Sequence, residues 1–435
     1  MKKTLLITSL VASMVAMAGT TGSVEGYNEN EATFVKSDPA IPATFVAKKT
    51  GVKTEVKVNG TGFSFGGDFK AEDLSLGHVE AAKFLDHSKV WAKYELPELK
   101  GVKSYVQATA EPKFIGTDKG SAELEGQVSY KYDTLTFGLN LKTNFPFAKS
   151  NVNDDYGIYV KSTHKVFVES EKDKDVFVKG LKDVRANVEV KHDYAKTVAN
   201  AGERVEYVSG EASAKYDAVK DLELEGKVAF KKNISGVNVE KYEVLGTELF
   251  EESPARYIHS YELKGTYKGV KHLTLSAKPF VAHVHINDNK NQIMYGTELV
   301  TEYKMLNDKL TLTGKSLLAG KQYRVFETQA SSLSKTNAGV FIFDANAKYD
   351  YKVSDKFTVS PEADAKLDLL IVDQQTEPFL TLTPKISAEY KATDTLTLTG
   401  SVEAPVKFEV NETSIKFEYK QTQLKTSLNL KYEWK

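Results

Sequence analysis

The sequence predicts an all-β fold, a transmembrane antiparallel up-and-down β-barrel of roughly 14 to 18 strands. Three observations support this class. A hairpin-like sequence pattern repeats along the chain, runs of alternating apolar and polar residues are long enough to cross a bilayer, and short connections alternate with long ones. After residue 18 the chain has no run of about 18 uninterrupted apolar residues, the length that a membrane helix needs. A closed barrel of strands is the other structure that can span lipid.

Residues 1–18 have the pattern of a secretory signal peptide. Two lysines at positions 2 and 3 precede an apolar run, and the run ends in Ala-Met-Ala, a small-x-small cleavage site. The apolar run is too short to cross a bilayer as a helix. We therefore expect export, with the mature chain starting near Gly19.

Residues 19–50 contain Pro39 and Pro42 and carry no sustained alternation of apolar and polar side chains. We predict a periplasmic N-terminal lead-in for 19–50 and assign the transmembrane β-barrel to 51–435.

Composition excludes several classes of protein. The 435 residues include no Cys, so disulfides, a cysteine-linked lipid anchor and a catalytic thiolate are all excluded. Charged residues make up 27% of the chain, but 58 Lys and Arg against 59 Asp and Glu give a formal net charge of −1. No basic surface for nucleic acid is indicated, and we expect no nucleic-acid partner.

One phrase recurs along the chain: a small residue, any residue, Tyr, a short polar segment and then an alternating run. Clear copies are AKYDAVKDLELEGKVAF (214–230), GTYKGVKHLTLSAKPF (265–280) and TEYKMLNDKLTLTGKSL (301–317). Alternation with a period of two on both sides of a polar turn predicts a β-hairpin for each copy. The repetition predicts an array of hairpins.

Strands with one apolar face belong either to a soluble sandwich or to a barrel whose apolar face meets lipid. The runs here reach about nine to eleven residues, as tilted membrane strands do, whereas soluble strands average about five or six. A Tyr recurs on the apolar face beside each turn, and an aromatic ring with a polar tip suits a membrane–water interface. We therefore predict an interfacial girdle of Tyr94, Tyr132, Tyr216, Tyr267, Tyr303, Tyr349, Tyr390 and Tyr419.

The connections opposite the Tyr-side turns are longer and polar, as external loops of such barrels are. Residues 71–91 are the least strand-like part of the chain. We predict a surface loop there, with a short helix folded into the lumen as the alternative.

The C-terminal run LKTSLNLKYEW (424–434) alternates and closes on aromatic residues. This ending resembles the terminal assembly strand of the bacterial outer-membrane β-barrel family, porins among them, although Lys435 follows where that family usually stops. The resemblance implies export to the cell outer membrane, contact with its lipid and its assembly machinery, and a porin-like homotrimer.

The direction of the last strands is left open. If every Tyr-side turn is periplasmic, Trp434 ends outside, opposite to what the resemblance implies. We therefore suspect a short external turn at 420–423 and a missed reversal near 403–405.

The function we predict is a porin-like channel for passive diffusion of small hydrophilic solutes and ions. Because both signs of charge alternate on the polar face, selectivity should be weak. Two alternatives stay open: a surface-exposed adhesin or structural barrel without an open pore, which would use 231–257 and 318–339 as contact surfaces, and a secreted β protein outside the membrane. The candidate pore-lining residues are Lys142, Glu223, Glu225, Lys227, Lys309, Lys315, Glu389, Glu403 and Lys407.

Three motifs have other chemical interpretations, and we favour none of them. TGKS at 313–316 lacks the earlier glycine of a phosphate-binding loop, because position 309 is Lys. His283 and His285 near Asp288 could share a metal ion, and the Asn- and Asp-rich loop at 151–155 could hold Ca²⁺. We predict no catalytic, cofactor or metal site and no enzyme activity.

Overall fold

The computed structural model describes the chain in thirteen ranges, and all but two of them contribute to the barrel wall. They are 19–35, 44–75, 88–112, 120–146, 158–196, 201–234, 243–244, 247–248, 257–287, 290–325, 337–372, 375–411 and 416–434. The predicted signal peptide lies outside them. Within these ranges, no helix is long and apolar enough to cross a membrane.

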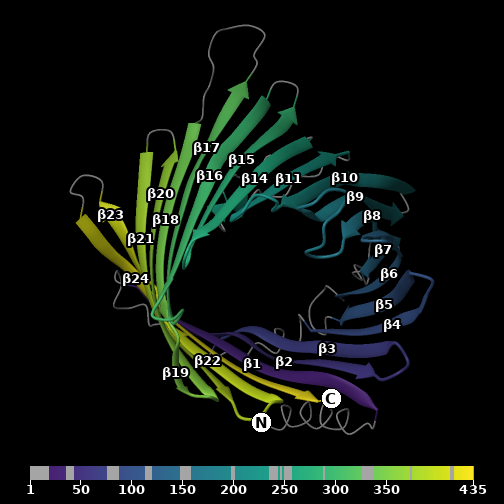
Figure 1. Ribbon diagram of the computed structural model, residues 1–435, viewed down its shortest axis with the longest axis horizontal. Helices are drawn as coiled ribbons and strands as arrows, with labels where there is room; N and C mark the ends of the chain where they lie inside the picture. The colour runs from purple at the N-terminus through teal and green to yellow at the C-terminus, as the bar shows by residue number, and fades with distance from the viewer. Residues whose placement is uncertain are drawn as a thin grey trace, which may run out of the picture.

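Twenty antiparallel wall strands in up-and-down order close into one barrel (Figure 1). Two wall strands are each named in two parts: β18 and β19 both pair with β20, and β22 and β23 both pair with β21 and β24. A separate two-stranded sheet consists of β12 (Glu243–Val244) and β13 (Thr247–Glu248). The wall consists of β1 (Thr20–Val35), β2 (Thr44–Val58), β3 (Phe63–Ser75), β4 (Lys89–Leu99), β5 (Val102–Pro112), β6 (Gly120–Tyr132), β7 (Leu135–Pro146), β8 (Ile158–Ser170), β9 (Leu181–Lys196), β10 (Ala201–Tyr216), β11 (Leu222–Asn233), β14 (Tyr257–Val270), β15 (Leu273–Asn287), β16 (Lys290–Met305), β17 (Leu310–Val325), β18 (Asn337–Tyr349), β19 (Tyr351–Ser354), β20 (Phe357–Val372), β21 (Gln375–Lys391), β22 (Leu396–Glu403), β23 (Val406–Asn411) and β24 (Lys416–Trp434).

The barrel closes where β1 pairs with β24. Gly22 lies opposite Trp434 at one end of this seam, and Val35 lies opposite Gln421 at the other. The predicted fold class is confirmed, whereas the predicted number of strands was too low. The lead-in predicted for 19–50 was wrong, because β1 and the start of β2 are wall strands.

The reason for this error lies in β1. Val24 and Ala32 are on the outer face, but Asn28 and Asn30 stand between them on that face and interrupt the apolar alternation. Pairing with both β2 and β24 supplies the backbone hydrogen bonds that hold this strand in the wall.

The two ends of the barrel differ. At one end, here called the turn end, short described turns join β2 to β3, β4 to β5, β6 to β7 and later hairpins. Lys100 and Gly101 have φ of 48° and 81°, as the two-residue turn that suits twisted strands requires. Many connections at the opposite, loop end cross residues outside the described ranges, including most of 71–91, where only the flanking strands are seen.

The two faces of the wall differ in curvature and chemistry. On the polar face, the Tyr105 hydroxyl of β5 lies 3.5 Å from Asn140 Nδ2 of β7, two strands away, as converging side chains on a concave surface do. On the opposite face Val128 and Leu139 expose 53% and 42% of their surface. The apolar face is therefore the convex outside of the barrel, and the polar face lines its interior.

The C-terminal strands run in the direction that the resemblance implies. The reversal expected near 403–405 is only a break inside one wall strand, between β22 and β23, where Pro405 has no backbone N–H for the ladder. The turn expected at 420–423 lies within β24, so that expectation was wrong as well. Trp434 consequently ends at the turn end beside Gly22.

One part of the inner wall is apolar. Phe280 of β15, Leu317 and Ala319 of β17, and Val340 and Ile342 of β18 form a buried cluster, in which Leu317 is 0% exposed. The Phe280 ring lies across Gly296 of β16, where a Cβ atom would come within 2.7 Å of the ring. Side chains on neighbouring strands therefore pack against each other in this sector instead of facing water.

At the turn end, Glu171 pairs with Lys131 and Lys174, and both ion pairs lower the pKa of its carboxyl group from 4.5 to about 2. A depressed carboxyl pKa adds stability that is present above about pH 4.5 and is lost as the pH falls towards 2. We expect the NMR titration of the Glu171 carboxyl to have its midpoint near pH 2. In the Lys131→Gln/Lys174→Gln variant the midpoint should return to about 4.3; an unchanged midpoint would contradict the pairing.

Candidate functional site

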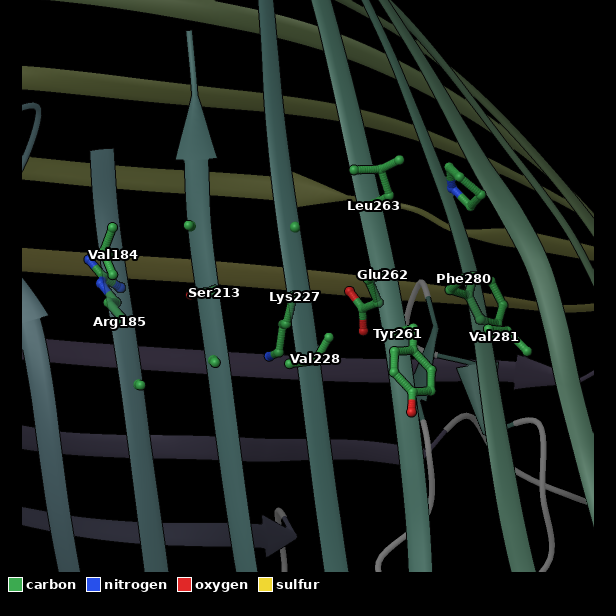
Figure 2. Close-up of a pocket in the computed structure, with 15 residues that line it drawn as sticks. Val184, Arg185, Ser213, Lys227, Val228, Tyr261, Glu262, Leu263, Phe280 and Val281 are labelled. Carbon is green, nitrogen blue, oxygen red and sulfur yellow. The ribbon is translucent and has the colours of Figure 1, made fainter. Parts of the chain in front are cut away.

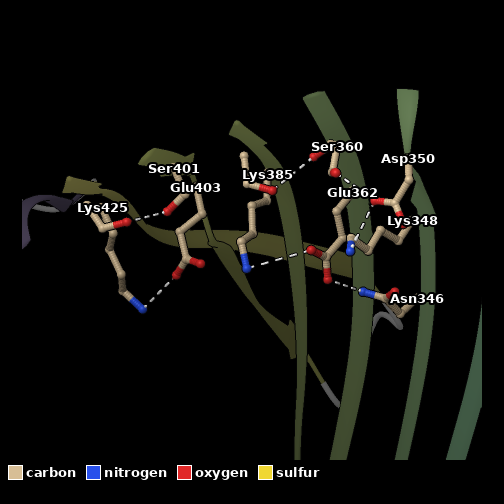
Figure 3. Close-up of polar contacts among 11 residues, drawn as sticks. Asn346, Lys348, Asp350, Ser360, Glu362, Lys385, Ser401, Glu403 and Lys425 are labelled. Atoms are coloured by element: carbon tan, nitrogen blue, oxygen red, sulfur yellow. Dashed lines mark hydrogen bonds and ion pairs between the residues drawn. The ribbon is translucent and has the colours of Figure 1, made fainter. Parts of the chain in front are cut away.

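The inner wall is the candidate functional site, and between β18 and β24 it carries a ladder of paired charges (Figure 3). Glu362 of β20 accepts a hydrogen bond from Asn346 Nδ2 at 2.7 Å, and its other oxygen lies 3.6 Å from Lys385 Nζ of β21. Glu403 of β22 lies 3.2 Å from Lys425 Nζ of β24. Antiparallel register places Glu362 opposite Lys385 and Glu403 opposite Lys425, so each of these two acids has a base on a neighbouring strand.

The opposite part of the inner wall, on β4 to β7, carries a second network. The Tyr105 hydroxyl donates a hydrogen bond to Glu125 at 2.6 Å, and Asn140 Nδ2 donates one to the same carboxylate at 2.8 Å. Lys93 Nζ lies 4.2 Å from the centre of the Tyr105 ring. These contacts fix the tyrosine ring against the wall.

Further ion pairs continue the pattern around the barrel. They join Lys142 to Glu123 at 2.9 Å, Lys227 to Glu211 at 2.8 Å and Lys278 to Glu298 at 3.5 Å. Because these groups remain partly exposed, each pair adds little stability. Their main effect is on the field inside the barrel, where adjacent opposite charges largely cancel and salt screens the remaining field over about 8 Å.

The structure places eight of the nine predicted pore-lining residues on this inner face. Lys142, Lys227 and Glu403 take part in the pairs above, and Lys315 lies opposite Asp344. Lys309 was misplaced by the prediction, because it belongs to the turn between β16 and β17. The remaining inner-face positions are Glu223, 3.9 Å from Lys268; Glu225, opposite Lys215; Glu389, 3.2 Å from Lys391; and Lys407, 4.0 Å from the Phe379 ring centre.

The repeated tyrosines lie on the outer face, seven of them near the turn end. Tyr419 does not belong with the others, because β24 carries it near the loop end, opposite Phe408. The seven are Tyr94, Tyr132, Tyr216, Tyr267, Tyr303, Tyr349 and Tyr390.

The outer face also has a hollow of about 720 Å³ across β9 to β15, shown in Figure 2. Its floor consists of the small residues Ala186, Ala212, Ala214 and Gly226, and larger apolar side chains such as Tyr261 and Leu263 stand beside it. Because these side chains are small, atoms of inner-face residues such as Lys227 also border the hollow. Its apolar surface suits contact with lipid chains.

Of the other sequence motifs, only TGKS lies wholly within the described residues. TGKS lies inside β17 and forms no phosphate-binding loop. Within the described part of the chain, no group of three or more His, Asp or Glu side chains could hold a metal ion. Asp288 and the loop at 151–155 lie outside the described residues.

The fold has counterparts among solved structures. The siderophore receptor PirA from Pseudomonas aeruginosa matches with a TM-score of 0.51 and 9% sequence identity, over 96% of this chain and 80% of the receptor. A chain of the FpvAI–pyocin S2 complex matches with a TM-score of 0.50 and 11% identity, over 96% of this chain and 70% of the other. The chain has the fold of bacterial outer-membrane β-barrel proteins.

OccK3 (OpdO) from Pseudomonas aeruginosa matches this barrel with a TM-score of 0.47 and 7% identity, over 95% of each chain. No protein-family model matches the sequence. No curated protein matches it either.

Two features of the inner wall were missed at the sequence level. The acidic partners Glu123, Glu211 and Glu362 could be assigned only once the strand register was known. The apolar sector did leave a signal, because Leu317-Leu318 and the run 340–343 are apolar on both faces, which a simple alternation does not explain.

Proposed function

We propose that this barrel lies in the bacterial outer membrane and passes small hydrophilic solutes by passive diffusion. The observation that carries the proposal is the charge-paired inner wall, in which lysines alternate with acids of neighbouring strands. Polar solutes meet hydrogen-bonding groups along such a wall, and no single-sign field repels ions of either charge.

The convex face supports the membrane location. Apolar side chains cover it between the turn-end tyrosines and the loop end, where a soluble protein would lose stability and solubility. Export by the N-terminal signal peptide and insertion by the outer-membrane assembly machinery complete the proposal, and a homotrimer follows from the family resemblance alone.

Liposome swelling tests the diffusion function. We expect liposomes that contain the refolded protein to swell rapidly in an isotonic solution of a monosaccharide and slowly in a large oligosaccharide, because the wall sorts neutral solutes by size. Empty liposomes are the control. Inserted, sheet-rich protein that allows no swelling would overturn free diffusion and favour the surface adhesin or structural barrel.

A further inference from the structure

A cluster of imidazoles lies on the outer face near the loop end. His259 of β14 stands directly opposite His283 of β15, and Tyr257 stands opposite His285. The Tyr257 and His285 rings stack with centres 4.5 Å apart and planes 11° apart, and the Tyr257 ring lies 5.2 Å from that of His259.

The cluster borders a hollow of about 700 Å³. Lys232 of β11 lies opposite Tyr257 and Phe230 lies opposite His259, so the hollow combines a cation, imidazoles and flat aromatic surfaces. No acidic side chain is among the described residues that line it. On the neighbouring β16, Asn291 Oδ1 lies 2.6 Å from His285 Nδ1.

The position of the cluster along the wall identifies its surroundings. On the outer face of β14, ten residues separate Tyr267 at the turn end from Tyr257. At about 3.3 Å per residue and a tilt of about 40°, this distance is about 25 Å along the membrane normal, the height of the apolar band of such barrels. If Tyr267 marks one membrane–water interface, the imidazoles stand at the other, level with lipid headgroups.

We propose that His259, His283 and His285, together with Lys232, bind the phosphate group of an outer-leaflet lipid. This site rests on the proposed membrane location and is independent of diffusion through the lumen. Lys232 supplies a permanent positive charge, and the imidazoles supply N–H donors and, once protonated, further charge.

Binding to the phosphate is coupled to protonation. Three adjacent imidazoles repel each other when charged, and a bound phosphate relieves this repulsion. The groups facing the cluster are Lys232 from β11, Tyr257 and His259 from β14, and His283 and His285 from β15, with no charged side chain described on β16 or β10 at this level. Lys231 of β11 also borders the hollow, but its ammonium group lies 4.3 Å from the centre of the Tyr207 ring. Affinity for the phosphate should therefore rise as the pH falls.

The test is titration of the full mature protein in mixed micelles with phosphatidic acid, at about pH 5.5 and pH 7.5, either side of the ordinary pKa of His. We expect tighter binding at the lower pH, by about fivefold for each imidazole that gains a proton. The His259→Gln/His283→Gln/His285→Gln variant should lose the tightening at the lower pH, and the pH dependence that it keeps, from the second ionisation of the phosphate at about pH 6, should have the opposite sign. His272→Gln is the matched control, because His272 lies at the turn end beside Asp308 and should change nothing.

A second variant covers the case in which the triple substitution fails to fold. The exposed Lys232→Gln should weaken binding about fivefold at both pH values. Phosphatidylcholine should bind equally at both pH values.

The proposal is overturned if phosphatidic acid binds the wild type and these variants equally, if inorganic phosphate displaces it at equal concentration, or if binding requires added Zn²⁺. Liposome swelling should be unchanged in both variants, so failure of this site is distinct from failure of the channel.

Discussion

Replacing Gly22 by Val is expected to prevent closure of the barrel. A Cβ atom at position 22 would come within 2.1 Å of the Glu55 backbone oxygen of β2 and within 2.6 Å of the Trp434 ring of β24. The Glu55 oxygen belongs to the backbone ladder between β1 and β2, so it cannot move without breaking that pairing, and the Trp434 ring would also have to turn away from its place beside Gly22. We expect a destabilisation of about 3 kcal/mol or more, at the upper end for overpacking.

The matched control is Gly26→Val. Gly26 lies four residues further along the same strand and on the same outer face, but a Cβ atom there meets nothing within 4 Å. Valine favours strands, so this variant should fold as well as the wild type. The measurement is the folded fraction after refolding, read from heat-dependent gel mobility and circular dichroism. Equal folded fractions for the two variants would show that β1 does not close the wall.

Neutralising the acids of the inner ladder is expected to make the channel prefer anions. In the Glu362→Gln/Glu403→Gln variant, Lys385 and Lys425 lose the carboxylates that lie 3.6 Å and 3.2 Å away. The wild type should show a reversal potential close to zero across a tenfold KCl gradient. The reversal potential of the variant should shift by about 10 mV or more towards the equilibrium potential of chloride, because uncompensated charges on a pore wall create potentials of several kT.

The complementary variant is the control for this effect. Lys385→Gln/Lys425→Gln removes the bases and leaves the acids. The reversal potential should therefore shift by a similar amount towards the equilibrium potential of potassium. Both shifts should shrink near 1 M salt, where the Debye length is about 3 Å. Unchanged reversal potentials in both variants would mean that this sector of the wall does not line the ion path.

The sequence was most informative where the alternation is long and regular. The hairpins around Tyr216, Tyr267 and Tyr303 follow directly from the period of two and from the polar turns. At the edges of the pattern the prediction was wrong for local reasons. Asn28 and Asn30 interrupt the apolar alternation of β1, so that strand was not predicted. Pro405 interrupts one wall strand between β22 and β23, and the interruption was taken for a reversal of chain direction.

The inner wall was predictable as a face but not as a network. Alternation separates Lys227 and Glu225 from Leu224 and Val228, and this separation depends only on neighbours in sequence. The ion pair of Lys227 with Glu211 and the stacking of Tyr257 on His285 depend on register between strands. A shift of register by one residue would exchange the faces, so such contacts cannot be read from one strand alone.

Planar-bilayer conductance of the refolded mature chain tests the central claim most directly. If the charge-paired wall surrounds a continuous aqueous path, the protein should insert in discrete steps and then carry a stable current in KCl. Circular dichroism on the same sample confirms that the inserted protein is sheet. Protein that inserts, remains sheet-rich and carries no current would contradict the channel function. The barrel would then have no open pore and would function through its outer surface.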